Sequence, residues 1–586
     1  MNEKWNLDPI YQGFEDPSYA ADCKTLEEKL SAMDGFSKAL SDRKDLLETL
    51  KEGVALQEEI VVLLTNLITY ANLRQAANTR DPEAASQMGR LMALYSQIAA
   101  PQAAFETWAS GLPELMELVQ SDAFLQPYTF LFFRIKENSR HLLPGLGEEI
   151  MAKMAISGSN AWGDLQSYIT STVPVMYRGE KINLPAVRNL AYDPDPQVRK
   201  DALEAELACY ERIEAPAAFA MNSIKLETLT DCALRGYASP LERTLKQANM
   251  SQKTLDAMFG AMKAYLPKFW QYLKCKAKAL GHENGLPWQD LFAPIGGSNT
   301  KLTAAEVREY LVKLFSGFDK EMADMVAEAF DNEWIDFYPR DGKTGGAFCA
   351  AVPSIRQSRV LTNFDGAFTD VVTLAHELGH AFHNLCIQDQ RPLNQDYSMP
   401  LAETASTFNE CVVMAAAIRD AKDKNEKLAL IESQLQDATQ IICDIYSRYL
   451  FEEAVFARRE EEFMDAPALC EIMTQAQKTA YGDGLDQSCM HPYMWVCKSH
   501  YYGPTFYNFP YAFGGLFARG LYARYEQEGE AFVPKYKKLL WTTTVASAED
   551  VAKVADIDLT DEGFWKAGLQ TIAEQIDLFC ALMEES

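Results

Sequence analysis

The feature that most constrains this chain is the pentapeptide His376–His380, which reads HELGH. It lies within Val371–Cys386, where apolar residues recur at helical spacing. On a helix, histidines four positions apart project from the same side one turn apart, so both imidazoles can reach one metal ion. Glu377 lies beside them. Two imidazoles with an adjacent carboxylate are typical of a zinc-dependent hydrolase, and the motif predicts such a site.

A third protein ligand is needed, because zinc in a hydrolase usually has three such ligands and one water. A local third histidine is excluded: where the longer motif H-E-x-x-H-x-x-G-x-x-H requires glycine and histidine, this chain has His383 and Cys386. The segment Pro400–Glu410 offers carboxylates on an expected helix that begins with proline. Glu403 and Glu410 are seven residues apart and share one face. We predict that Glu403 is the ligand and that Glu410 accepts the free ring N–H of a ligating histidine.

The motif also predicts the roles of its neighbours. Glu377 is expected to take a proton from the attacking water and to deliver it to the leaving amine. His383 lies two turns beyond His376 on nearly the same line of the helix. It either lines the substrate cleft or satisfies a hydrogen bond in the core, and we expect the cleft.

An unusual concentration of aromatic residues follows in His500–Gly514. Rings at this density usually form core. A histidine together with several phenols is also a set of hydrogen-bond donors, and the tetrahedral intermediate of peptide hydrolysis needs donors for its oxyanion. His500 and the tyrosines of this segment are therefore candidates for that role.

Most of the chain is predicted to be helical, with apolar residues at helical spacing in long stretches such as Leu26–Leu50, Val54–Ala77, Val198–Leu229 and Leu428–Glu461. The exception is Trp334–Asn363, where glycines, prolines and short β-type runs predict a small sheet just before the motif helix. An edge strand there either holds an extended peptide by main-chain hydrogen bonds or caps the core.

A chain of 586 residues is too long for one simple core, so two or more lobes are expected. Prolines and aspartates cluster between residues 180 and 200. We predict an N-terminal helical lobe over residues 1–195 and a catalytic zinc-peptidase domain over residues 196–586.

The net charge of −28 argues against nucleic acid and anionic membranes as partners, because a polyanion repels both. The N-terminus has no apolar signal core, and the most apolar run, Ile60–Ile68, is too short to span a bilayer. The twelve cysteines include no C-x-x-C pair, and many have apolar neighbours. They are expected to be buried thiols in a reducing compartment rather than disulfides. We therefore expect a cytoplasmic protein; its oligomeric state stays open.

Three blocks in this order resemble the oligoendopeptidase F group of the thimet oligopeptidase family of zinc metallopeptidases: His376–His380, Ala402–Ser406 and His500–Gly514. Shorter matches extend the resemblance over nearly the whole chain: Trp5–Asp8, Tyr237–Glu242 and Gly345–Phe348. The resemblance implies a mainly α, multi-helix zincin-type fold with two lobes around a deep channel. Such a channel admits short unstructured peptides and excludes folded proteins.

The resemblance also implies roles for single residues. His376, His380 and Glu403 match the zinc ligands, and Glu377 matches the general base. His500 and Tyr511 match residues that contact the substrate carbonyl or the oxyanion. Gly345 and Gly346 match a segment close to bound peptide. Relatives often carry further tyrosines where this chain has Asn508, Phe509 and Pro510, so Tyr511 is the first candidate for the oxyanion donor and Tyr507 the second.

The leading hypothesis is a zinc endopeptidase that cleaves internal bonds of oligopeptides, with one Zn²⁺ per chain. One alternative is a zinc carboxypeptidase or dipeptidase on a similar helical shell. Another is a non-catalytic peptide-binding protein, although binding alone needs no general base such as Glu377.

Overall fold

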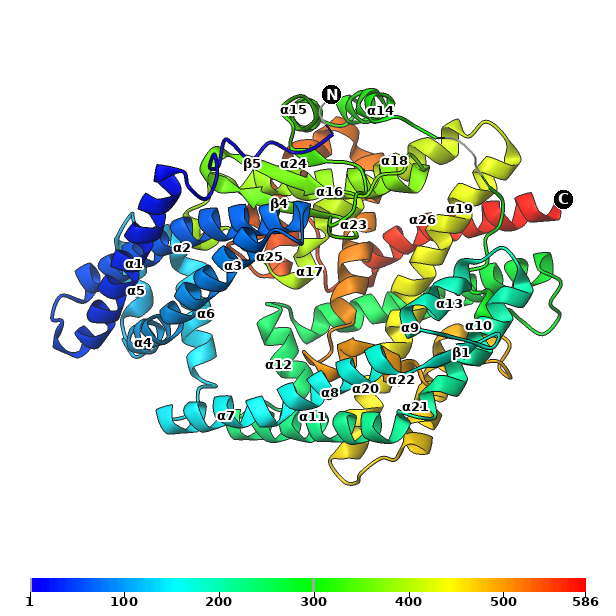
Figure 1. Cartoon of the computed structure of the whole chain (residues 1–586), viewed down its shortest axis with the longest axis horizontal. Coiled ribbons are helices and arrows are strands. Elements are labelled where there is room, and N and C mark those ends of the chain that lie inside the picture. The colour runs from blue at the N-terminus through cyan, green and yellow to red at the C-terminus, as the bar shows by residue number, and fades with distance from the viewer. Residues whose placement is uncertain (1–2, 298–300, 586) are drawn as a thin grey trace. The chain divides into compact units, whose positions relative to one another are not determined.

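The computed structural model describes residues 3–297 and 301–585. Most of these residues are in α-helices, and small sheets complete the regular structure, which confirms the prediction of a mainly α fold (Figure 1). The chain divides into two compact units, each formed from three stretches. Unit 1 comprises Met1–Arg140, Asn299–Val413 and Arg524–Ile557, and unit 2 comprises His141–Ser298, Met414–Ala523 and Asp558–Ser586. The boundary expected near residue 195 stays a prediction.

Unit 1 begins with a layer of long helices whose starts are set by aspartates. Asp16, Asp45 and Asp81 each accept a backbone N–H from the first turn of the helix that follows, which satisfies donors that would otherwise lack partners. The helices of this unit are α1 (Pro17–Lys38), α2 (Leu46–Ala77), α3 (Pro82–Tyr95), α4 (Ala99–Ser110), α5 (Leu115–Ser121), α6 (Thr129–Ser139), α14 (Ala304–Ser316), α15 (Lys320–Asp331), α16 (Phe368–Ile387), α17 (Met399–Ala402), α24 (Val533–Thr542) and α25 (Ala548–Lys553).

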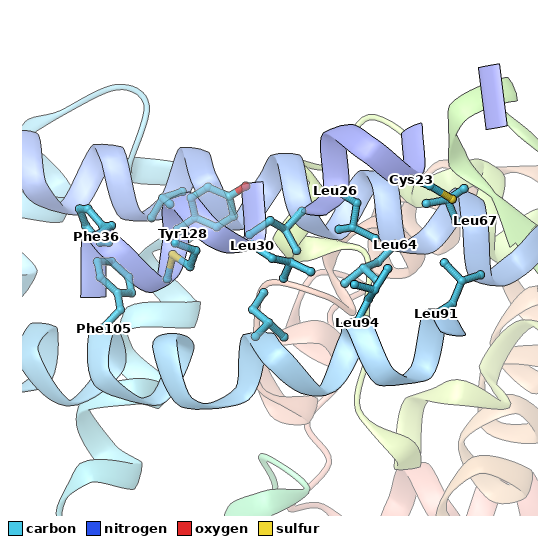
Figure 2. Packing of buried hydrophobic residues seen from close by; sticks show 14 of the residues in the cluster. Cys23, Leu26, Leu30, Phe36, Leu64, Leu67, Leu91, Leu94, Phe105 and Tyr128 are labelled. Atoms are coloured by element: carbon cyan, nitrogen blue, oxygen red, sulfur yellow. The ribbon is translucent and has the colours of Figure 1, made fainter. Parts of the chain in front are cut away.

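The core of this helical layer is built from leucines at helical spacing (Figure 2). Leu26 of α1, Leu67 of α2 and Leu91 of α3 have no exposed surface. Phe105 of α4 stacks on Trp108 and contributes a large buried ring. Each such side chain stabilises the fold by about 1.5–3 kcal/mol relative to an exposed position. Burial of these residues explains the helical apolar periodicity of the first hundred residues.

Helix α2 is apolar for the same reason. Within the described residues it is the single helix whose length and composition would allow it to cross a membrane. In its most apolar window 44% of the residues are buried inside the protein. Its buried face contacts α1 and α3, so the apolar character has an explanation within unit 1 itself.

A three-stranded sheet lies before the motif helix, as predicted. The strands are β3 (Ile335–Asp336), β4 (Phe348–Val352) and β5 (Gln357–Leu361), in the order β3-β5-β4. β5 pairs in parallel with β3 and antiparallel with β4. Helix α16 packs against the sheet, and Asn384 donates a hydrogen bond to the Ser358 hydroxyl at 3.2 Å. In this order β4 is an edge strand, with one side of its backbone unpaired within the sheet.

The described residues of unit 2 are also mainly helical and include the β1–β2 hairpin. Its elements are α7 (Gly145–Ser157), α8 (Ser159–Thr172), β1 (Val175–Tyr177), β2 (Glu180–Ile182), α9 (Leu184–Asn189), α10 (Pro196–Tyr210), α11 (Glu214–Arg235), α12 (Pro240–Gln247), α13 (Gln252–Ala279), α19 (Lys424–Thr439), α20 (Ile445–Arg459), α21 (Ala466–Tyr481), α22 (Met494–Cys497) and α26 (Glu562–Glu584). α18 (Thr404–Asp420) and α23 (Phe509–Glu528) connect stretches assigned to different units.

The structure corrects the expectation for two of the cysteines. Cys275 of α13 and Cys580 of α26 form a disulfide, with their Cα atoms 5.8 Å apart. The two helices pack along each other, and Tyr265 donates a hydrogen bond to Gln570 at 2.9 Å. The cysteines are 305 residues apart, so only the packing of α13 on α26 brings them together. Among the described residues, the other ten cysteines form no disulfide.

Candidate metal centre

Helix α16 carries the motif at the border of the core. Val371, Leu374 and Leu378 have no exposed surface and fix one side of the helix in unit 1. The side chains of His376 and His380 are 24% and 18% exposed. The apolar face therefore determines the rotation of the helix, and this rotation leaves both imidazoles accessible.

The two predicted histidine ligands and Glu403 meet at one point. Oε2 of Glu403 is 3.4 Å from Nε2 of His376 and 3.4 Å from Nε2 of His380. The two imidazole rings are nearly perpendicular, with centroids 4.9 Å apart. Zinc bonds of about 2.1 Å in a tetrahedron place neighbouring ligand atoms about 3.4 Å apart. These three donors therefore fit a zinc ion, and their chemistry, two imidazoles and one carboxylate, is typical of a zinc hydrolase.

Glu403 lies at a break in the expected helix. The segment folds as a short helix, α17, followed by α18, and Glu403 is the residue between them, with φ −92° and ψ 12°. Its carboxylate accepts a hydrogen bond from the Ser406 hydroxyl at 2.7 Å. Burial alone would raise the pKa of Glu403, but its contacts with His380 and Ser406 hold that pKa at about 2. The carboxylate is thus ionised, as a metal ligand must be.

Glu410 occupies the place predicted for it behind His376. Its Oε1 is 2.6 Å from Nδ1 of His376, so this carboxylate fixes the Nδ1–H tautomer and leaves Nε2 free to ligate. Burial opposes a positive charge on His376, but the neighbouring carboxylates, Glu410 first among them, outweigh this effect and raise the pKa of His376. The geometry is that of a carboxylate–histidine pair oriented for metal binding.

Two contacts between α16 and α18 hold these residues in place, and sequence reasoning alone did not identify them. Asn409 donates a hydrogen bond to the carbonyl of Ala375 at 3.0 Å. Gly379 lets the helices approach closely, because a Cβ at this position would lie 2.5 Å from the carbonyl oxygen of Ala405 and 2.6 Å from Cα of Ser406. The glycine within HELGH is the one sequence signal from which this approach could have been inferred.

Glu377 lies on the same helix with 6% of its surface exposed. Burial raises its pKa above the usual value for a glutamate, and the neighbouring histidines act in the opposite direction. A raised pKa brings a carboxylate closer to the range in which it both accepts and returns a proton near neutrality. This environment suits the predicted general base.

The structure corrects the expectation for His383. The residue is fully buried, its Nε2 lies 2.8 Å from the hydroxyl of Thr543, and its ring stacks on Tyr397 at 4.3 Å. Burial lowers the pKa of His383 to about 3, so the ring is neutral. A residue without exposed surface does not line a cleft. His383 is therefore a core histidine, because α24 covers this end of α16.

The predicted glycines precede the edge strand of the sheet. Gly345 and Gly346 are exposed, and no atom within 4 Å would contact a Cβ at either position. Gly346 has φ +78°, a conformation that favours glycine. Asn363 donates a hydrogen bond to its carbonyl at 2.8 Å. The backbone before β4 is therefore open to solvent.

The predicted oxyanion donors form a cluster in unit 2. The rings of His500, Tyr507 and Tyr511 lie 5.6–5.9 Å from one another, centroid to centroid. Burial, together with the positive charges of Arg448 and Lys498, lowers the pKa of His500, so its imidazole is neutral at pH 7. A neutral imidazole and two phenols are hydrogen-bond donors of the kind that the sequence predicted.

Comparison with known proteins places this site in a family. Residues 303–570, which contain α16 and the segment from Glu403 to Glu410, match peptidase family M3. Residues 112–173 match the family described as oligopeptidase F. Residues 303–570 therefore form a peptidase family M3 domain. M3 proteins are metallopeptidases, and the matched residues include the candidate metal-binding group His376, His380 and Glu403.

Relatives are similar to this chain over nearly its whole length. Oligopeptidase PepF of Bacillus subtilis is 22% identical over 588 residues, which cover 98% of this chain and 86% of the relative. An oligoendopeptidase F homolog of Lactococcus lactis is 23% identical over 619 residues, which cover 99% of this chain and 97% of the relative. The predicted resemblance to oligoendopeptidase F is confirmed.

Solved structures show the same fold. A putative peptidase from Chlamydophila abortus has a TM-score of 0.87 at 19% identity, and the match covers 99% of this chain and 98% of the peptidase. Oligoendopeptidase F from Enterococcus faecium has a TM-score of 0.71 at 17% identity, and the match covers 96% of this chain and 100% of the oligoendopeptidase. The helical fold with its small sheet is therefore shared with these solved structures, one of which is an oligoendopeptidase F.

Proposed function

We propose that this chain is a zinc-dependent endopeptidase that hydrolyses internal bonds of short, unstructured peptides. The observation that carries the proposal is the position of the Glu403 carboxylate, 3.4 Å from Nε2 of both histidines, with Glu410 holding His376 from behind. A bound zinc ion would lower the pKa of its water and polarise the scissile carbonyl. His376, His380 and Glu403 would hold that ion.

Glu377 is the general base of the proposed reaction. It accepts a proton from the attacking water and transfers that proton to the nitrogen of the leaving amine. Its low exposure and its raised pKa support this role, because a carboxylate partly freed from its hydration shell accepts a proton more readily.

His500 and Tyr511 are the proposed donors to the substrate carbonyl and to the oxyanion that forms from it, with Tyr507 as a further donor. The three side chains form one cluster and His500 is neutral, which supports donation of a hydrogen bond rather than a full charge. Removal of one oxyanion donor from an enzyme typically costs about 10²–10³ in kcat.

The edge strand β4 is the proposed support for the peptide backbone. Its outer edge is unpaired within the sheet, and Gly345 and Gly346 leave the preceding backbone exposed. An extended peptide added to such an edge gains main-chain hydrogen bonds that are independent of its sequence. This mode suits a peptidase with many substrates.

The printed names of the relatives, oligopeptidase and oligoendopeptidase, support oligopeptides as substrates. We further propose a channel that limits substrate length, a cytoplasmic location, and no nucleic-acid or membrane partner. The net charge of −28 supports the last point.

The test combines metal analysis with peptide digestion. We expect one zinc per chain and cleavage of internally quenched peptides blocked at both ends, with a sharp upper limit as peptide length increases. Glu377→Gln should retain zinc and lose about 10²–10⁴-fold in kcat. Cleavage of peptides with a free terminus alone would favour the exopeptidase, and zinc-dependent peptide binding without hydrolysis would favour the binding protein. Full activity of Glu377→Gln would contradict the mechanism.

A further inference from the structure

A buried carboxylate lies directly behind the segment that carries Tyr507. Glu452 of α20 has no exposed surface. Its Oε1 accepts hydrogen bonds from Lys225 Nζ at 2.6 Å and from the backbone N–H of Phe506 at 3.1 Å. Its Oε2 accepts one from the Asn508 amide at 2.9 Å. Both chain neighbours of Tyr507 are therefore bound to the same carboxylate.

The backbone at this point adopts a conformation that needs support. Phe506 has φ +50°, in the left-handed region that non-glycine residues rarely adopt, at a cost of about 1–2 kcal/mol. Its carbonyl accepts a hydrogen bond from the N–H of Asn508 at 2.7 Å. Its ring packs against Tyr449 and Phe456, with centroids 5.5 and 5.6 Å away. The Phe506 N–H has Glu452 as its acceptor, so the carboxylate helps to retain this conformation.

We propose that Glu452, held by Lys225, is the positioning residue that orients Tyr507 and Tyr511 for the reaction. Tyr507 lies between the two anchored residues, and its ring is 5.6 Å from that of Tyr511. The inference rests on the proposed function, because it assigns Glu452 a role through those phenols. Glu452 itself contacts Lys225, Phe506 and Asn508.

The energetics favour positioning over simple stabilisation. Lys225 is 1% exposed, so the Lys225–Glu452 pair is removed from water on both sides. A buried ion pair often stabilises a fold no better than apolar residues of the same size, because desolvation offsets the attraction. An apolar pair would join α11 to α20 equally well. It would leave the Phe506 N–H and the Asn508 amide without their acceptor.

Unit 2 contains a matched control. Glu432 of α19 is 2% exposed and pairs with Lys276, which has no exposed surface. It also accepts hydrogen bonds from Tyr272 and Gln436, so its partners lie on α13 and α19. Glu432→Gln and Glu452→Gln make the same chemical change in two buried ion pairs. Glu432→Gln reports the loss of a buried ion pair, whereas Glu452→Gln also removes the contacts to Phe506 and Asn508. The difference between the two variants therefore measures the effect on the Tyr507 segment.

The first measurement is kinetic. With an internally quenched peptide, we expect Glu452→Gln to lower kcat about 10²-fold and to leave KM within about threefold. Glu432→Gln should keep kcat within about twofold of wild type despite a similar loss of thermal stability. The double variant Glu452→Gln/Asn508→Asp places a carboxylate opposite the new amide and should recover about tenfold in kcat. If Glu452→Gln does not fold, Asn508→Ala removes one anchor, keeps the ion pair and should lower kcat in the same way.

The second measurement, amide hydrogen exchange over residues 503–508, does not depend on activity. We expect faster exchange there in Glu452→Gln and unchanged exchange in Glu432→Gln. Two results would overturn the positioning role and leave the proposed function intact, provided that the wild type is active. One is an equal kcat for Glu452→Gln and Glu432→Gln. The other is faster exchange in Glu452→Gln without a loss of kcat. A wild type that cleaves no peptide would overturn the proposed function, and the positioning role with it, whatever the exchange shows.

Discussion

The contact at Gly379 makes the most direct prediction, because it links one missing side chain to metal affinity. In Gly379→Ala the new methyl group would meet the Ala405 carbonyl oxygen at 2.5 Å and Cα of Ser406 at 2.6 Å. Both are backbone atoms and have no rotamer to change. Ordinary van der Waals contact begins at 3.4 Å, so α16 and α18 would have to separate by about 0.9 Å. Overpacking of this kind costs about 1–3 kcal/mol of unfolding free energy.

This displacement would act on the metal ligands. Glu403 is anchored to α18 through its hydrogen bond with Ser406, one of the two residues that the methyl group contacts. A shift of α18 therefore moves the carboxylate away from Nε2 of the two histidines. Disturbing the residues that orient metal ligands typically costs 10–100-fold in affinity, and we expect a loss of about that size.

The assay is zinc affinity, measured by competition with a chromophoric chelator, together with urea unfolding of the zinc-free protein. Gly89→Ala is the control: Gly89 is exposed on α3 of the same unit, and no atom within 4 Å would meet its Cβ. This variant should bind zinc as wild type does and gain up to about 1 kcal/mol from helix propensity. Wild-type zinc affinity and stability in Gly379→Ala would refute the close-approach argument.

Further predictions concern other contacts of unit 1. Glu410→Ala leaves Nδ1 of His376 without its acceptor, so zinc affinity measured by chelator competition should fall about 10–100-fold. An unchanged zinc affinity would show that Glu410 does not orient the imidazole of His376. Burial lowers the pKa of His383 to about 3 in the folded state, whereas an unfolded histidine has a pKa of ~6.5. The unfolded state therefore gains a proton first as the pH falls. The contribution of His383 to stability is present above pH ~6.5 and is lost as the pH falls towards 3. The stability gap between wild type and His383→Gln should therefore narrow by ~2 kcal/mol between pH 7 and pH 5 in urea unfolding, and a constant gap would contradict this assignment. Glu58 accepts two hydrogen bonds from Arg391, each at 2.7 Å. Glu58→Gln should therefore lower the unfolding free energy by about 1–3 kcal/mol without changing the zinc content. An unfolding free energy equal to that of wild type would mean that solvent screens this pair.

Sequence reasoning was most successful where the relevant partners are close in the chain. The spacing of His376 and His380 determines their geometry on any helix, and the seven-residue spacing of Glu403 and Glu410 placed both on the side facing the motif. The small sheet was also predicted, because its glycines, prolines and β-branched residues are contiguous. The site was less well predicted where a helix was taken as continuous, since the break at Glu403 follows from packing rather than from local propensity.

The sequence by itself determined the mainly helical class and the histidine–glutamate motif, because short-range periodicity and motif spacing carry this information. Its resemblance to oligoendopeptidase F rests on three sequence blocks in a fixed order. Only the tertiary structure decided which groups are buried and which distant residues meet. It placed His383 under α24, joined Cys275 to Cys580, and brought Glu452 to the backbone of Phe506. These contacts join residues 54 to 305 positions apart, and no local pattern encodes such a pairing. The physical reason is that burial and close approach belong to the packing of whole helices, and each helix fits its neighbours only once the chain has folded.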